Sequence, residues 1–185
     1  MMKFRHICVA VALATGTHQA SGAPANAIAV PPMSAAAAKA TTSAESPQLM
    51  QFKAAIRAKY DLKEKAFAEH DAETIVTKFY TADVISVGEG EGIYVGRDQI
   101  RPLYLEVVKT NQVKVHSVYS YVNGNAGWDW ADFEVLPLDP RMQPFTFAIL
   151  FLWSRESGEW MCKGDFFVNG SLRTGKLEPP AAATK

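Results

Sequence analysis

The positions of apolar and polar residues divide the chain into a helical first part and, from Gln112 onward, an extended second part. In the first part, apolar side chains recur at steps of three and four over residues 48–70, which predicts an amphipathic helix. Ser46 and Pro47 suit its N-cap and its first helical position. The stripe on this helix consists of Leu49, Phe52, Ile56, Tyr60, Lys63 and Phe67.

Two shorter helices and two short strands follow. Asp71 can cap a helix over residues 73–80, and Asp98 can cap another that continues to Val108. Between them, residues 84–87 and 93–95 are typical of strands, joined by a tight loop with the sequence GEGEG.

The second part alternates with a period of two, which predicts four long strands over residues 113–122, 126–135, 145–154 and 160–168. An Asn-Gly-Asn turn joins the first two of these strands. Helices followed by an antiparallel meander are typical of the α+β class. We therefore predict a cone-shaped domain in which a curved antiparallel sheet wraps around the long N-terminal helix.

The two ends of the chain do not share this pattern. A short basic start is followed by ten apolar residues, Ile7 to Gly16, and then by small residues, as in a secretory signal peptide over residues 1–25. Ten apolar residues are too few to cross a bilayer, which takes about 20. Residues 26–45 are rich in Ala and Pro and predict a flexible linker, residues 46–177 the domain, and residues 178–185 a tail. We expect export to a periplasm or secretion, with no membrane span.

Composition narrows the function. Lys and Arg number 19 and Asp and Glu number 19, so the chain lacks the positive charge typical of nucleic-acid binders, and we expect no such partner. Of the two cysteines, Cys8 would leave with the signal peptide and Cys162 would remain alone, which excludes a disulfide scaffold. GEGEG lacks the Lys-Ser/Thr ending of a phosphate-binding loop, and no second histidine stands at ligand spacing. We therefore expect neither a metal nor another cofactor.

Several short motifs resemble the nuclear transport factor 2-like proteins of the SnoaL-like and ketosteroid isomerase-like kind. They are the helix ending at Asp71, Phe79-Tyr80 before Ala82-Asp83, Gly96-Arg97-Asp98 before Ile100, and Gly158-Glu159-Trp160 with Asp165 five residues after the tryptophan. The resemblance covers about residues 49–168. It implies a cone with a pocket, often in a dimer, and it spans isomerases, dehydratases, cyclases, epoxide hydrolases, lyases and plain binding domains.

The ketosteroid isomerase-like branch implies a carboxylate base just after the first strand, where Glu89 stands here, followed by Glu91. That branch also implies an acidic donor on a late strand and a tyrosine on the first helix. Ile149 and Lys63 stand near those positions, so we do not expect ketosteroid isomerisation itself. A solvated loop is the alternative environment for the two glutamates.

Other candidate catalytic residues lie in the strands. Asp165 stands in a strand rich in aromatic residues, where a buried carboxylate needs a partner such as Lys163, His116 or Tyr94. Asp132 alternates with Glu134 at a strand end, and such a pair can divide acid and base roles, although strand-end charges commonly face water. His116 is the one histidine predicted within the sheet.

Aromatic side chains are abundant in the predicted strands. Some would form the core and some a subunit interface, and the remainder would line a pocket for a flat apolar molecule. The candidates for substrate binding are Tyr94, Tyr119, Trp128, Trp130, Phe147 and Phe166. We hypothesise a homodimeric lyase or isomerase without a cofactor, which acts on a small apolar or aromatic molecule by proton abstraction, elimination, dehydration or retro-aldol cleavage. The alternative is a non-catalytic module for small-molecule binding or dimerisation.

Overall fold

The computed structural model describes residues 45–90 and 92–175, and these residues belong to one compact unit. The predicted signal peptide, nearly all of the predicted linker, Glu91 and the predicted tail lie outside the described residues. Within the described residues, no helix combines the length and the apolar composition that a bilayer crossing requires.

The long helix α1, Pro47–Ala68, begins as predicted. The Ser46 side chain accepts a hydrogen bond from the Leu49 backbone N–H over 3.2 Å and so caps the first turn. Every residue of the predicted apolar stripe except the first, Leu49, is buried. Lys63, the charged member of the stripe, is buried as completely as the aromatic members. This stripe is the surface on which the sheet packs.

The predicted second helix is present but is α-helical only in its first turn. Asp71 caps α2, Ala72–Thr74, which continues as the π-helical turn η1, Ile75–Phe79, and strand β1 already begins at Tyr80. The wide turn leaves carbonyl groups without helical partners. The guanidinium group of Arg97 donates hydrogen bonds to the carbonyl oxygen of Thr77, within this turn, and to that of Tyr80, directly after it. The third helix, α3, Arg97–Val107, starts one residue before Asp98, because Gly96 adopts a positive φ of 79° at its N-cap.

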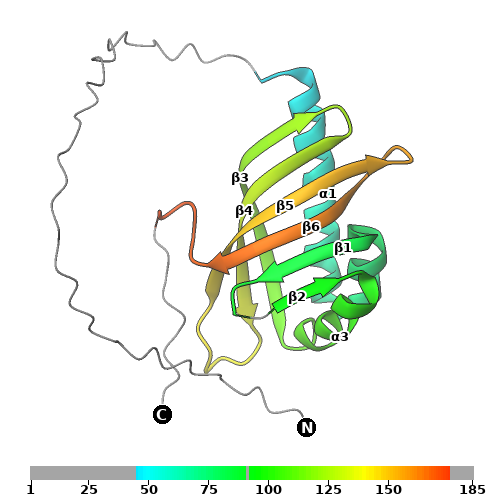
Figure 1. Ribbon diagram of the computed structural model, residues 1–185. Helices are drawn as coiled ribbons and strands as arrows, with labels where there is room; N and C mark the ends of the chain where they lie inside the picture. The colour runs from blue at the N-terminus through cyan, green and yellow to red at the C-terminus, as the bar shows by residue number, and fades with distance from the viewer. Residues whose placement is uncertain (1–44, 91, 176–185) are drawn as a thin grey trace, which may run out of the picture. The chain divides into compact units, whose positions relative to one another are not determined.

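Six strands form one sheet in the order β2-β1-β6-β5-β4-β3 (Figure 1). Their bounds are Tyr80–Gly88 (β1), Gly92–Val95 (β2), Asn111–Asn123 (β3), Ala126–Pro137 (β4), Phe145–Glu156 (β5) and Glu159–Asn169 (β6). The predicted antiparallel sheet needs one correction, because β1 and β6 pair in parallel. The reason is topological: α3 carries the chain to the far edge of the sheet, and the meander β3 to β6 then returns beside β1.

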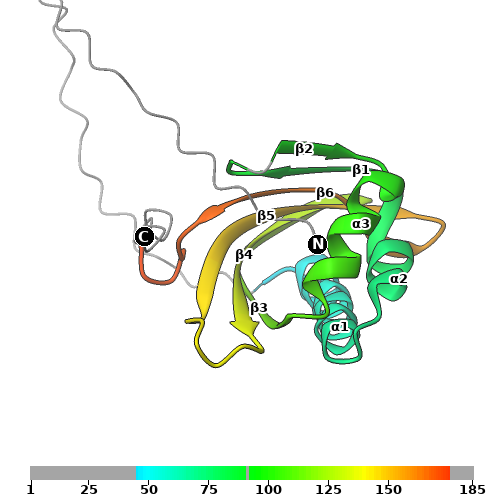
Figure 2. The ribbon, with the colours of Figure 1, turned by 90° about the horizontal axis from the view of Figure 1, so that it is seen from below.

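The sheet curves, and the helices gather on its concave side (Figure 2). We call the side that faces α1 and α3 the inner face and the opposite side the outer face. Strand alternation assigns side chains to the two faces in rows across the sheet. One inner row consists of Ser86, Asp165, Phe151, Asp129 and Ser120. The neighbouring outer row consists of Phe166, Leu150, Trp130 and Tyr119.

Candidate active site

Hydrogen bonds join four ionisable side chains from four elements between the helices and the inner face. The amine Nζ of Lys63 lies 2.9 Å from the hydroxyl oxygen of Tyr80, which lies 2.7 Å from Asp165 Oδ2 and 2.7 Å from the hydroxyl oxygen of Tyr104. Ser86 donates to Asp165 Oδ1 over 2.5 Å. We call these five residues the Lys63–Asp165 network.

Local structure explains why these residues meet. Lys63 occupies the buried stripe of α1, and Tyr80 is the first residue of β1, directly after the π-helical turn. The parallel pairing of β1 with β6 places Ser86 opposite Asp165. Tyr104 completes the network from α3, and it is the partly exposed member of the five.

The donors and acceptors define a direction for proton transfer. An ionised Asp165 can only accept, so the hydroxyl groups of Tyr80 and Ser86 both donate to it. Tyr80 has a single hydroxyl proton, which lies in the hydrogen bond to Asp165. The Tyr80 oxygen therefore accepts hydrogen bonds from the Lys63 amine and from the Tyr104 hydroxyl group. The resulting chain of donors runs from Tyr104 through Tyr80 to Asp165.

Burial dominates the electrostatics of this site. Desolvation lowers the pKa of Lys63 to about 8, although the negative charge of Asp165 acts in the opposite direction. Burial, together with the charge of Asp165, raises the pKa of Tyr80 and of Tyr104 well above the usual tyrosine range. Both phenols are therefore neutral near pH 7 and act as hydrogen-bond donors.

Aromatic rings enclose the amine of Lys63. Nζ lies 4.3 to 5.4 Å from five ring centroids, those of Phe79, Tyr80, Tyr104, Phe133 and Phe151. The side chain is 1% exposed, and no ion pair between described residues includes it. The rings offer cation–π attraction in place of water.

A second buried carboxylate, Asp129, lies on the same inner row. Tyr60 donates to its Oδ2 over 2.6 Å, and Ser117 and Ser120 each donate to its Oδ1 over 2.6 Å. Burial raises the pKa of Asp129 despite these three donors. Because the serines stand on either side of the irregular pairing between Ser117 and Tyr119, Asp129 fixes that bulge in β3.

The predicted catalytic residues lie in four different environments. Asp165 belongs to the network, but it bonds Tyr80 and Ser86 rather than Lys163, His116 or Tyr94, and Lys163 instead pairs with Asp83. Glu89 is exposed and accepts from the backbone N–H of Asn169 over 3.0 Å.

The other two predicted catalytic residues belong to the outer face. His116 Nε2 lies 3.4 Å from Glu134 Oε2. Asp132 is buried under the segment after β6, where it accepts from the Ser171 hydroxyl group, the Leu172 backbone and the Arg173 guanidinium group. These donors outweigh burial and lower the pKa of Asp132, so this carboxylate is an anchor for residues 171–173.

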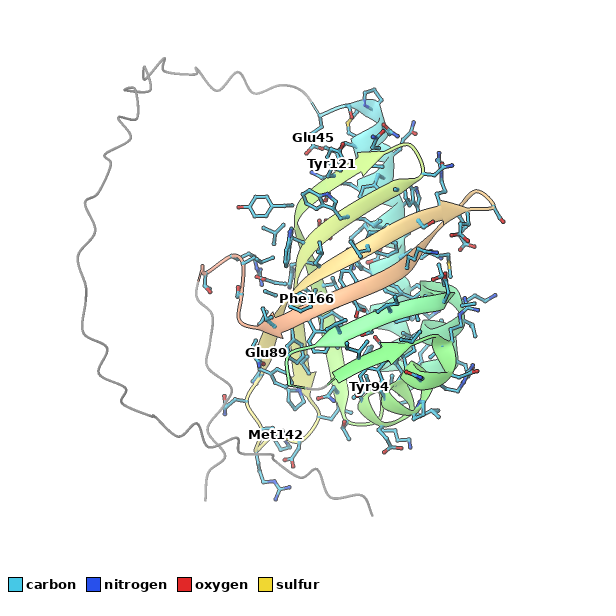
Figure 3. All side chains as sticks on the ribbon, viewed as in Figure 1. Glu45, Glu89, Tyr94, Tyr121, Met142 and Phe166 are labelled. Atoms are coloured by element: carbon cyan, nitrogen blue, oxygen red, sulfur yellow. The ribbon has the colours of Figure 1, made fainter. Side chains whose placement is uncertain are left out.

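The predicted substrate-binding residues are divided between the two faces. Tyr94 and Phe147 are partly buried against the core. The other four lie on the outer face, where Tyr119 is 63% and Phe166 44% exposed and where Trp128 stacks on Tyr121. Figure 3 shows Tyr121 and Phe166 on the side of the sheet away from α1.

Sequence reasoning did not select Lys63, Tyr80, Tyr104 or Asp129 as site residues. A signal existed for Lys63, because a charged residue within an apolar stripe is rarely buried without a partner. Asp129 lies two and four residues before Ala131 and Phe133 in the same strand, so its side chain points to the same, buried face. This alternation was a second signal, for burial of Asp129. None of the described His, Cys, Asp and Glu side chains gather in a group of three that could hold a metal ion.

Solved structures with this arrangement include ketosteroid isomerase-like and nuclear transport factor 2-like proteins. A ketosteroid isomerase-like protein from Erwinia carotovora atroseptica is 20% identical, with a TM-score of 0.55 over 69% of this chain and 99% of that one. A protein of unknown function from Mycobacterium tuberculosis is 15% identical, with a TM-score of 0.60 over 77% of this chain and 86% of that one. A nuclear transport factor 2-like protein of unknown function from Pseudomonas putida is 12% identical, with a TM-score of 0.55 over 71% of this chain and 96% of that one.

These similarities establish the class: the chain has the nuclear transport factor 2-like fold, as its sequence motifs predicted. No family model matches the chain. No curated protein matches it in sequence either.

Proposed function

We propose that the chain is an exported enzyme, a lyase or isomerase without a cofactor, that moves protons on a small apolar or aromatic molecule. The observation that carries the proposal is the Lys63–Asp165 network. Enclosing an amine, two phenols and a carboxylate among aromatic rings opposes folding, because charged and polar groups lose their hydration there. Groups held in this way concentrate at functional sites.

Tyr104 is the member of the network that a small molecule would contact, since it alone of the five residues is only partly buried, and its hydroxyl group points to Tyr80. In the proposed reaction, the Tyr104 oxygen takes a proton from a substrate carbon. Its own proton passes to Tyr80, and that of Tyr80 passes to Asp165. Reversal of these transfers delivers the proton to another carbon in an isomerisation, or to a leaving oxygen in a dehydration.

Replacing Tyr104 by phenylalanine should lower turnover by about 10²- to 10⁴-fold, because the ring stays and the proton donor is lost. The measurement is absorbance on a panel of aromatic β-hydroxy ketones, which report dehydration or retro-aldol cleavage, and β,γ-unsaturated ketones, which report isomerisation. Tyr119→Phe is the matched control, because Tyr119 is exposed on the outer face. Equal turnover by Tyr104→Phe and the unaltered chain would contradict the proposal.

A non-catalytic binding module is the second candidate, favoured by one observation. Both oxygens of Asp165 already accept hydrogen bonds, and Lys63 is enclosed, so the network is also complete as a structural element. Binding without catalysis predicts that the same ketones raise the melting temperature and are recovered unchanged.

We also propose that the outer face pairs with a second copy of the chain. Five half-exposed apolar side chains, with Trp128 and Trp130 beside them, amount to roughly 600 Å², which approaches the ~800 Å² that each partner buries in a standard interface. The five are Ile85, Tyr119, Tyr121, Leu152 and Phe166. Three acidic residues near this face already have a basic neighbour, which reduces the repulsion between apposed copies: Asp132 lies beside Arg173, Asp83 beside Lys163, and Glu134 3.4 Å from His116.

Leu152→Glu is expected to convert a dimer into a monomer, because it places a charge in the centre of this apolar face. Light scattering coupled to size-exclusion chromatography measures the mass. Leu105→Glu is the matched control, since Leu105 is exposed to a similar degree on α3. A monomeric unaltered chain, or a dimer that survives Leu152→Glu, would contradict this interface.

A further inference from the structure

The amine of Lys63 is held in an unusual way for a buried lysine. Its hydrogen bond to the Tyr80 hydroxyl group is the one found among the described residues, whereas an ammonium group has three donors. Rings rather than acceptors surround the rest of the amine, and Asp165 is reached only through Tyr80. An enclosure so poor in acceptors raises the fraction of the neutral amine, which is the nucleophilic form.

The ionisable groups that face the amine come from three elements. They are Tyr80 on β1, Tyr104 on α3, and Asp165 and Cys162 on β6. Burial outweighs the charge of Asp165 and brings the pKa of Lys63 to about 8. At pH 7 about one Lys63 side chain in ten is then neutral, against about one in 3,000 for a lysine at 10.5, a difference of about 300-fold.

We propose that Lys63 binds a small aldehyde or ketone covalently, as an imine. The proposal rests on the proposed function for its site and names the substrate class, a carbonyl compound. The lone pair of Nζ attacks the carbonyl carbon, and the carbonyl oxygen takes a proton to give a carbinolamine. Loss of that oxygen as water, with the second Nζ proton, leaves a carbon–nitrogen double bond. Hydrolysis reverses both steps and restores the amine.

The network supplies the proton transfers for these steps. The Tyr80 hydroxyl group touches Nζ, and Tyr104 and Asp165 supply and accept protons through it. A protonated imine withdraws electrons from the adjacent bond, so the same site can cleave a carbon–carbon bond or release a proton beside the carbonyl carbon. Retro-aldol cleavage and isomerisation would then share one intermediate.

Access to the amine involves Tyr104. Its ring centroid lies 5.1 Å from Nζ, and Tyr104 as a residue is partly exposed while Lys63 is 1% exposed. A carbonyl compound would enter as this ring turns aside. Tyr104→Ala is therefore expected to speed imine formation, and Tyr104→Phe to leave entry unchanged.

The test is reductive labelling of the full-length chain, with benzaldehyde and acetaldehyde as separate probes and cyanoborohydride as the reductant. Peptide mass mapping measures the labelling of each lysine. Lys65, on the same helix with a side chain 72% exposed, is the internal reference. We expect Lys63 to label at least about tenfold faster than Lys65 at pH 7, with the ratio falling at pH 10, where ordinary lysines are also neutral. The chain with Lys63→Met should give adducts at Lys65 and none at position 63.

Labelling of Lys65 with none at Lys63, or a ratio below one at pH 7, would overturn the proposal. This failure is distinguishable from failure of the proposed function. If Tyr104→Phe abolishes turnover while Lys63 remains unlabelled, proton transfer through Tyr104 stands and the imine does not. If Lys63 labels but Tyr104→Phe turns over normally, the imine stands and the proton relay does not.

Discussion

Asp165→Asn is expected to lower the free energy of unfolding by about 1–3 kcal/mol, the range typical of leaving a buried hydrogen-bonding group without its partner. The amide fills the same space, so no cavity contributes. It removes the negative charge that faces Lys63 and replaces one accepting oxygen by a donor. Either Tyr80 or Ser86 then loses its acceptor. Urea denaturation at pH 7 measures the change.

A second substitution separates charge from packing. Lys63→Met in the Asp165→Asn background removes the unpaired amine and should recover at least half of the lost stability, because an apolar side chain of similar size suits the ring environment. Asp83→Asn is the surface control: Asp83 pairs with Lys163 in solvent and should show no measurable change. An Asp165→Asn chain as stable as the unaltered one would show that the two groups are not coupled.

The hydrophobic pattern was sufficient to predict the architecture. The stripe on α1 and the period of two from Gln112 onward predicted the long helix and four long strands close to their observed bounds. The motifs around Asp71, Gly96 and Trp160 predicted the fold, which the solved structures confirm. The parallel contact between β1 and β6 was missed, because pattern alone does not fix where a returning meander meets the first strand.

The candidate site was less predictable, for two physical reasons. Alternation shows that Trp128, Trp130 and Asp132 share one face, but not whether that face is concave. Both faces are rich in aromatic residues here, so hydrophobicity could not identify the inner one. The position of Tyr80 depends on a π-helical turn and on Arg97, 17 residues later, which no local pattern encodes.

The dependence of stability on pH should reveal Lys63 directly. Its pKa is about 8 in the folded chain and near 10.5 when unfolded, so between these values the unfolded chain carries a proton that the folded chain lacks. Stability then rises with pH across this window and is lowest below pH 8. The difference between 8 and 10.5, at about 1.4 kcal/mol for each pH unit, amounts to about 3 kcal/mol.

Other buried groups act in the opposite direction at high pH. Burial raises the pKa values of Cys162, Tyr60, Tyr80 and Tyr104, so the unfolded chain loses their protons first and stability falls above about pH 9. Subtracting the stability of the unaltered chain from that of Lys63→Met at each pH isolates the contribution of the lysine, because both chains contain all four of these groups. Urea denaturation of both chains from pH 6.5 to 10.5 should show the advantage of Lys63→Met shrinking by about 3 kcal/mol. A constant difference across this range would mean that Lys63 titrates in the folded chain as it does in water.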